Sequence, residues 1–160
     1  MNVGDLCSRK VISVSASAPL SVAARLMCEQ RVGAVIVTAA PADRAVAVGI
    51  VTDRDIVCAQ LDRSADLSQL RTADIMTGDP LVLNENAPVE EAIDRLHERH
   101  VRRAPVISSG GELIGVISFD DLLAHVAGNL RALAQLADAR MHPRRHGSRA
   151  GHDAKPGMAG

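Results

Sequence analysis

The chain has 160 residues, of which 47% are hydrophobic and 23% charged, and its net charge at pH 7 is −1. These values are typical of a soluble globular protein with one domain or two very small ones. Phe119 is the single aromatic residue, so the core has to be aliphatic. The chain also lacks the rings on which the bases of single-stranded nucleic acids stack, and we expect no nucleic-acid partner.

The sequence carries no sign of a membrane or secretory segment. No apolar stretch approaches the length that crosses a bilayer, and residues 1–6 lack the cationic start and apolar run of a signal peptide. We therefore expect a cytoplasmic protein with no membrane partner. The three cysteines (Cys7, Cys28 and Cys58) are far apart in the sequence, which indicates reduced thiols rather than disulfides.

Two histidine pairs have the spacing of metal ligands. His97 and His100 lie near the expected end of a helix, and His142 and His146 lie in a polar tail. Histidine is commonplace in both settings, and cationic side chains are favoured at a helix C-terminus. We expect no metal site and no required cofactor.

The first half of the chain shows strand and helix patterns in alternation. A short strand is expected around residues 11–14, followed by helical spacing of apolar residues over 20–30. Apolar runs predict strands over 34–38 and 46–52, separated by a loop near Pro41. A helix over 54–60 follows.

The second half shows the same order. A short strand is expected around residues 81–83, and Pro88 opens a helix with apolar residues at helical spacing. Strands are predicted over 104–107 and 112–118, around a turn at Ser108–Gly111, and helical spacing resumes over 119–127.

The C-terminal region divides into a helix and a tail. Residues 129–140 have leucines at helical spacing and are expected to extend the last helix. Residues 140–160 hold five Lys or Arg against one Asp, a net charge of +4 that leaves −5 for the rest of the chain. With its Gly, Pro and His content, the tail over 141–160 is expected to be disordered and dispensable.

The two halves are copies of each other. Asp5-Leu6-Cys7-Ser8 aligns with Asp74-Ile75-Met76-Thr77 at an offset of 69 residues, and Gly49-Ile50-Val51-Thr52 aligns with Gly115-Val116-Ile117-Ser118 at an offset of 66. The chain therefore contains two β-α-β-β-α units. One unit is too small to cover its own sheet, so we expect the two to pack about a pseudo-twofold axis with matched clefts between them.

At the junction of the last strand and helix each copy carries Gly-hydrophobic-x-Thr/Ser-x-x-Asp, at residues 49–55 and 115–121. The chain resembles the tandem CBS domain family, as a stand-alone pair of the prokaryotic type. The basic pair before Ala104-Pro105-Val106 resembles the family as well. The resemblance implies an α/β fold divided into CBS domain 1 (3–60), a linker (61–71), CBS domain 2 (72–128), a C-terminal helix (129–140) and a disordered tail (141–160).

The hydroxyl and carboxylate pairs at these junctions have two compatible interpretations. Thr52 with Asp55, and Ser118 with Asp121, have the spacing of a helix capping box. The resemblance implies that the aspartates bind the hydroxyls of a ribose and that Thr52 or Ser118 reaches the sugar or phosphate. A helix N-terminus also favours an anion.

Arg102 and Arg103 are the candidate phosphate ligands. Cations are common after a helix C-terminus, but Arg also binds phosphate oxygens in a bidentate manner, and the resemblance implies that role here. The first copy has Gly33-Ala34 at the matching positions. The two clefts are therefore expected to be unequal.

Three further residues complete the candidate site. The resemblance places the hydroxyls of Ser8 and Thr77 close to a nucleotide, although both residues could equally form turns. Without aromatic rings, a base is expected to lie between aliphatic side chains such as Val82.

The resemblance implies a regulatory module that has no chemistry of its own. We expect it to sense an adenosine-containing effector (AMP, ADP, ATP, NAD or S-adenosylmethionine) and to act on a regulated protein that the sequence does not identify. The alternative is a constitutive homodimerisation or partner-binding scaffold with empty clefts. A homodimer is expected in both cases, because apolar helix faces exceed what one pair can cover; these faces carry Leu20, Ala23, Leu26, Met27, Leu122, Leu123 and Val126.

Overall fold

The computed structural model describes residues 1–39, 45–63 and 66–141. The loop expected near Pro41 and the tail expected after Met141 lie outside these residues. The contacts within the chain define one unit over Met1–Val126 and a second over Ala127–Gly160, and each is described by itself below.

The first repeat is a small sheet with two helices. Its elements are β1 (Ser13–Ser15), α2 (Leu20–Gln30), β2 (Ala34–Ala39), β3 (Val46–Thr52) and α3 (Asp53–Arg63). Strand β1 is parallel to β2, and β2 is antiparallel to β3. The parallel pair requires a crossover connection, which α2 provides. The predicted bounds of α2 and β3 are confirmed, and α3 continues three residues beyond its predicted end.

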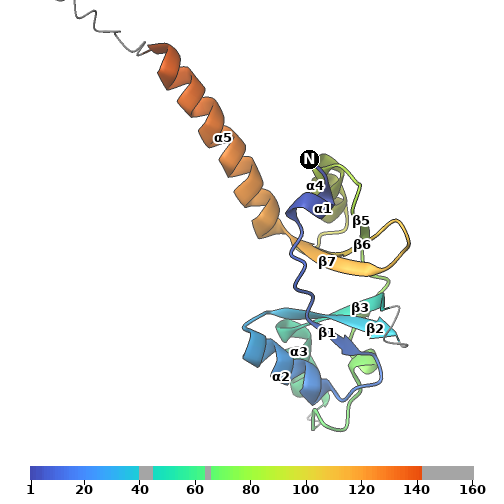
Figure 1. Ribbon diagram of the computed structural model, residues 1–160. Helices are drawn as coiled ribbons and strands as arrows, with labels where there is room; N and C mark the ends of the chain where they lie inside the picture. The colour runs from blue at the N-terminus through green and yellow to red at the C-terminus, as the bar shows by residue number, and fades with distance from the viewer. Residues whose placement is uncertain (40–44, 64–65, 142–160) are drawn as a thin grey trace, which may run out of the picture. The chain divides into compact units, whose positions relative to one another are not determined.

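The second repeat has the same order: β5 (Leu83–Asn84), α4 (Val89–Glu98), β6 (Arg103–Ile107), β7 (Leu113–Ser118) and α5 (Phe119–Met141). The register irregularity between Val106 and Ile107 in the β6–β7 pair matches the one between Val37 and Thr38 in the β2–β3 pair. The helices predicted over 119–127 and 129–140 form one continuous helix, α5 (Figure 1).

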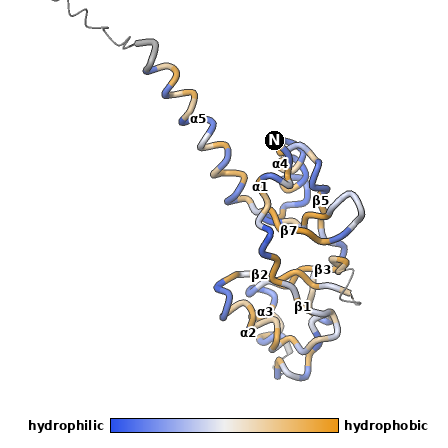
Figure 2. Tube along the Cα trace, viewed as in Figure 1, coloured by the Kyte–Doolittle hydropathy of each residue, from blue (hydrophilic) through white to orange (hydrophobic). Residues whose placement is uncertain are grey.

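Each repeat has its own aliphatic core, built where the inward faces of its strands meet the inward faces of its helices. Strands β2, β3 and β7 are strongly hydrophobic stretches of the trace (Figure 2). The first core contains Val14, Leu20, Ala23, Met27, Val35, Val37, Val51, Ile56 and Ala59. The second contains Val3, Cys7, Leu81, Leu83, Val89, Ala92, Leu96, Ala104, Val106, Ile117 and Leu122.

These cores correct one expectation from the sequence. Four side chains proposed to form outer apolar faces are buried within their own repeats, namely Leu20, Ala23, Met27 and Leu122. Each repeat uses its main apolar helix stripe to cover its own sheet. On the proposed outer faces, Leu123 and Val126 remain exposed.

The segment that precedes each repeat packs against the other repeat. Helix α1 (Val3–Leu6) contributes Val3 and Cys7 to the second core, and Ser8 bridges to Val116 of β7. In the same way, the 3₁₀ helix η1 (Thr72–Asp74) leads into β4 (Thr77–Gly78), which pairs with β3. This reciprocal exchange joins the two repeats about an approximate twofold axis.

Two glycines make room for the exchanged segments. A Cβ atom on Gly115 would lie 2.7 Å from Sγ of Cys7 and 2.9 Å from the backbone oxygen of Ser8. A Cβ atom on Gly49 would lie 2.6 Å from Sδ of Met76. The close approach also buries Cys7, and desolvation raises the pKa of its thiol.

We expect Gly115→Ala to destabilise the protein by about 1–3 kcal/mol, because the added methyl group overpacks the crossing of β7 and the N-terminal segment. The measurement is the free energy of unfolding from urea denaturation. Gly128→Ala is the control, because no atom lies within 4 Å of its Cβ position. That change should stabilise α5 by about 0.5–1 kcal/mol. Equal effects of the two substitutions would contradict the importance of the crossing.

Candidate functional site

The candidate site lies where β7 ends and α5 begins, and the junction of β3 and α3 is its counterpart in the first repeat. At the first-repeat junction, the backbone N–H of Thr52 donates to Oδ2 of Asp55 (2.8 Å), and so does its hydroxyl (2.7 Å). The N–H of Asp55 donates back to the Thr52 hydroxyl at 3.2 Å. The predicted capping box is therefore present.

The second-repeat junction has the same box. The N–H and the hydroxyl of Ser118 both donate to Oδ2 of Asp121, and the N–H of Asp121 donates to the Ser118 hydroxyl at 3.3 Å. The two hydrogen bonds that the carboxylate accepts both end on Oδ2, and the box makes no use of Oδ1. An aspartate in this arrangement can cap a helix and still present an acceptor to a ligand.

Arg102 and Arg103 both lie beside the second junction. Residues Arg103 and Ser118 are directly opposite in the antiparallel β6–β7 pair, so their side chains project from the same face of the sheet. The N–H of Phe119 donates to the backbone oxygen of Arg102 at 2.7 Å, which fixes Arg102 at the start of α5.

The two arginines differ in their partners. The Arg102 guanidinium lies 5.1 Å from the centre of the Phe119 ring and 3.7 Å from Oδ1 of Asp120. The side chains of Arg102 and Asp120 are 75% and 80% exposed, so their ion pair contributes little. Arg103 is half-buried and forms no salt bridge with any described residue.

The first junction lacks this positive charge. Ala34 is opposite Thr52, where the second repeat has Arg103 opposite Ser118. Asp53 occupies the first position of α3, and its carboxylate accepts from the N–H of Arg54 at 2.8 Å. A carboxylate at a helix N-terminus takes the position that favours an anion. The formal charge of the first junction is −1, from Asp53, Arg54 and Asp55, whereas that of the second is 0, from Arg102, Arg103, Asp120 and Asp121.

The exchanged segments carry the two remaining hydroxyls to the sheets. Ser8 is paired with Val116, two residues before Ser118, and Thr77 is paired with Ile50, two residues before Thr52. Both side chains are exposed. Val82 is half-buried and precedes β5.

The structure therefore divides the predicted residues into two groups by their pairing. Around the second junction it brings together Ser8, Arg102, Arg103, Ser118 and Asp121; around the first it brings together Thr52, Asp55 and Thr77. Val82 is paired with neither group.

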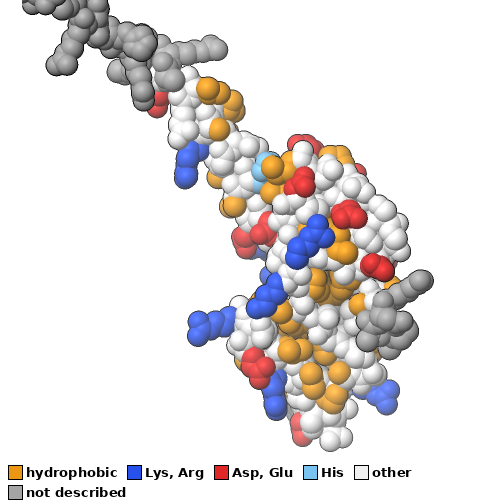
Figure 3. Space-filling model, viewed as in Figure 1, with side chains coloured by type: hydrophobic (Ala, Val, Ile, Leu, Met, Phe, Trp, Pro, Cys, Tyr) orange, Lys and Arg blue, Asp and Glu red, His pale blue; other side chains and the backbone are white. Residues whose placement is uncertain are grey.

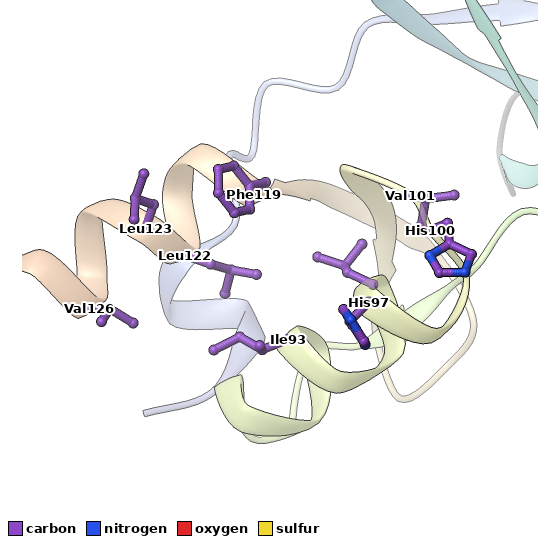
Figure 4. Close-up of a pocket in the computed structure, with 9 residues that line it drawn as sticks. Ile93, His97, His100, Val101, Phe119, Leu122, Leu123 and Val126 are labelled. Carbon is purple, nitrogen blue, oxygen red and sulfur yellow. The ribbon is translucent and has the colours of Figure 1, made fainter.

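A separate hollow lies on the helical side of the second repeat. Hydrophobic side chains reach the surface along α5 (Figure 3), and those of its first two turns face α4 across a pocket of about 410 Å³ (Figure 4). The pocket is lined by Ile93, Leu96, His97, His100, Val101, Phe119, Leu122, Leu123 and Val126. None of the predicted ligand residues lines it, and the apolar spacing of α4 and α5 was the only sequence signal for it.

Two kinds of feature are absent from the described residues. No group of three or more His, Cys, Asp or Glu side chains there could hold a metal ion. None of the helices in that part of the chain has both the length and the apolar character needed to span a bilayer.

We expect Ser118→Ala to lower the free energy of unfolding by about 0.5–2 kcal/mol, since α5 loses its N-cap hydroxyl. Ser118→Thr is the matched control, because Thr52 forms the same box in the first repeat. Thermal and urea denaturation would measure both. If Ser118→Ala left stability unchanged, the box would have no capping role.

The similarity of this chain to known proteins covers both repeats. A family model described as CBS domain matches residues 3–62 and 73–128. Hypoxic response protein 1 of Mycobacterium tuberculosis is 28% identical over 139 residues, which cover 87% of this chain and 93% of that protein. Other relatives are longer: the matched region is 61% of MK0525 from Methanopyrus kandleri and 21% of inosine-5'-monophosphate dehydrogenase from Thermoplasma acidophilum.

Solved structures share the fold. The crystal structure of hypoxic response protein I with two coordinated zinc ions is 30% identical, with a TM-score of 0.68 over 78% of this chain and 98% of that one. Two less similar structures contain adenosine compounds. The CBS domain pair of MJ0100, in complex with 5-methylthioadenosine and S-adenosyl-L-methionine, is 19% identical, with a TM-score of 0.69 over 81% of this chain and 98% of that one. The CBS domain of a bacterial CNNM/CorC family Mg²⁺ transporter, in complex with ATP, is 22% identical, with a TM-score of 0.70 over 80% and 88%.

Proposed function

The chain belongs to the CBS domain family, and from this premise we propose that it is a regulatory module that binds an adenosine nucleotide where β7 meets α5. The ligand class is AMP, ADP, ATP or NAD, each of which joins an adenosine to at least one phosphate. S-adenosylmethionine fits this junction less well, because it has no phosphate to meet the arginines.

The observation that carries the proposal is the position of Arg103. Arg103 is half-buried, forms no salt bridge with any described carboxylate, and lies on the same sheet face as Ser118. The N-terminus of α5 adds a partial positive charge at the same place. A phosphate group would neutralise both charges and accept hydrogen bonds from the guanidinium.

Asp121 supplies the second part of the recognition. Its capping box uses Oδ2, and Oδ1 can accept from the hydroxyls of a ribose. A nucleotide carries both a ribose and a phosphate group. A carboxylate and an arginine in one site therefore match its two polar parts. The adenosine compounds in complex with the MJ0100 domain pair and the ATP in complex with the transporter domain support this ligand class.

We propose that the two junctions are unequal and that phosphate binds at the second one. The first junction has Ala34 in place of Arg103 and the Asp53 carboxylate at its helix start. One nucleotide per chain is therefore the expected stoichiometry.

Regulation by such a module requires a conformational or assembly change rather than chemistry. We propose that the module itself is not catalytic and that it acts as a homodimer on a regulated protein. Its cytoplasmic location stays a prediction from the sequence.

Titration calorimetry with ATP, ADP, AMP, NAD, adenosine and S-adenosylmethionine tests this function. We expect Arg103→Ala to weaken ATP binding by about 1.5–3 kcal/mol, roughly ten- to a hundredfold, because a charged hydrogen-bond partner is lost. Adenosine binding should not change. Arg54→Ala is the matched control at the first junction, where Asp53 already occupies the helix start.

Asp121→Ala should also weaken ATP binding more than Asp55→Ala does. Equal losses at the two junctions would contradict the assignment to the second. If none of these ligands releases heat or raises the melting temperature, the junctions are helix caps alone, and the remaining function is that of a scaffold.

A further inference from the structure

Helix α5 carries a stripe of apolar residues at heptad spacing. Leu123, Val126, Leu130, Leu133 and Ala137 follow one another at intervals of three, four, three and four residues. We call these five residues the α5 seam. Alternation of three and four is the pattern of a helix that packs along its length against another helix.

Most of the seam is exposed in the single chain. Every described side chain from Ala127 to Asp138 is exposed, and the exposed fractions of Leu130, Leu133 and Leu136 are 62%, 63% and 64%. The described residues 127–138 of α5 bury no apolar face within their own chain, and most helical stability in proteins comes from the packing of such a face. A partner that covers the leucines would stabilise this part of α5.

The other described helices of the chain do not offer a matching stripe. Those with an apolar stripe of their own, α2 and α4, use it to cover their own sheets: Leu20, Ala23 and Met27 on α2, and Val89, Ala92 and Leu96 on α4, are all buried. Helix α3 exposes Val57 and Leu61, one turn apart, which is a shorter stripe than the seam. Another copy of α5 has the same spacing as the seam by identity.

The positions that flank the seam also permit an identical partner. On one side lie Leu122, Asn129 and Leu136, and on the other lie Ala127 and Ala134. Flanking charges are what usually decide which helices pair in a coiled coil. None of these five residues is charged, so two copies of α5 meet no repulsion there.

We propose that α5 pairs with α5 of a second copy of this chain, with the α5 seam as the contact, whether or not a nucleotide is bound. The first seam residues, Leu123 and Val126, also line the pocket beside α4, and Phe119 lies one heptad before Val126. The second copy would therefore cover the exposed apolar wall of the pocket on α5 as well as the leucines that follow it.

Sedimentation velocity of the full chain over a dilution series tests the pairing. The wild type should be a dimer at micromolar concentration. The double variant Leu130→Gln/Leu133→Gln should raise the dissociation constant of the dimer at least about tenfold, because both leucines lose their apolar contacts. Glutamine retains a good helix propensity, and the circular dichroism of the two proteins should agree.

Ala124→Gln/Ala132→Gln is the matched control, because it introduces the same side chain twice on the opposite face of α5 and should leave the dissociation constant unchanged. A wild type that is a monomer at micromolar concentration, or a double variant that dimerises as well as the wild type, would overturn the proposal. So would a control that weakens the dimer as much as the leucine variant does.

The same samples separate this inference from the proposed function. A shift in melting temperature with ATP reports on the junction of β7 and α5, and it should persist in Leu130→Gln/Leu133→Gln. If ATP stabilises every variant but the wild type is a monomer, the α5 pairing fails and the nucleotide site stands. If the variant dissociates but no nucleotide binds, the pairing stands and the site fails.

Discussion

The exchange of N-terminal segments between the repeats is the contact on which the rest of the fold depends. Each sheet is completed by a segment that belongs in sequence to the other repeat, through Ser8 on β7 and Thr77 on β3. The exchange places Val3 and Cys7 in the second core, so separation of the repeats would expose part of that core. Gly115 and Gly49 are required at the two crossings because a methyl group on either would meet sulfur and backbone atoms below 3.0 Å.

The two junctions are related by the approximate symmetry of the repeats, so the residues that differ between them distinguish one junction from the other. Both junctions carry the same capping box, so the box alone gives no reason to prefer one of them. Arg103 and Phe119 in the second repeat replace Ala34 and Asp53 in the first. These replacements remove a carboxylate from the start of the following helix and add a guanidinium beside it, so the second junction is less negative than the first.

Helix α5 connects the candidate site with the α5 seam. Its first turn contains Asp121 of the capping box, and its apolar stripe begins at Phe119, whose ring contacts Arg102. The capping box and the seam are therefore parts of one continuous helix.

The sequence by itself determined the two repeats, the bounds of α2 and β3, and both capping boxes, because these features depend on periodicity and on contacts three residues apart. The tertiary structure alone decided the exchange of segments, the position of Arg103 opposite Ser118, and the burial of Leu20, Ala23 and Met27. The physical reason is that pairing register and burial depend on residues distant in sequence. An apolar stripe has the same spacing whether it covers its own sheet or a second molecule.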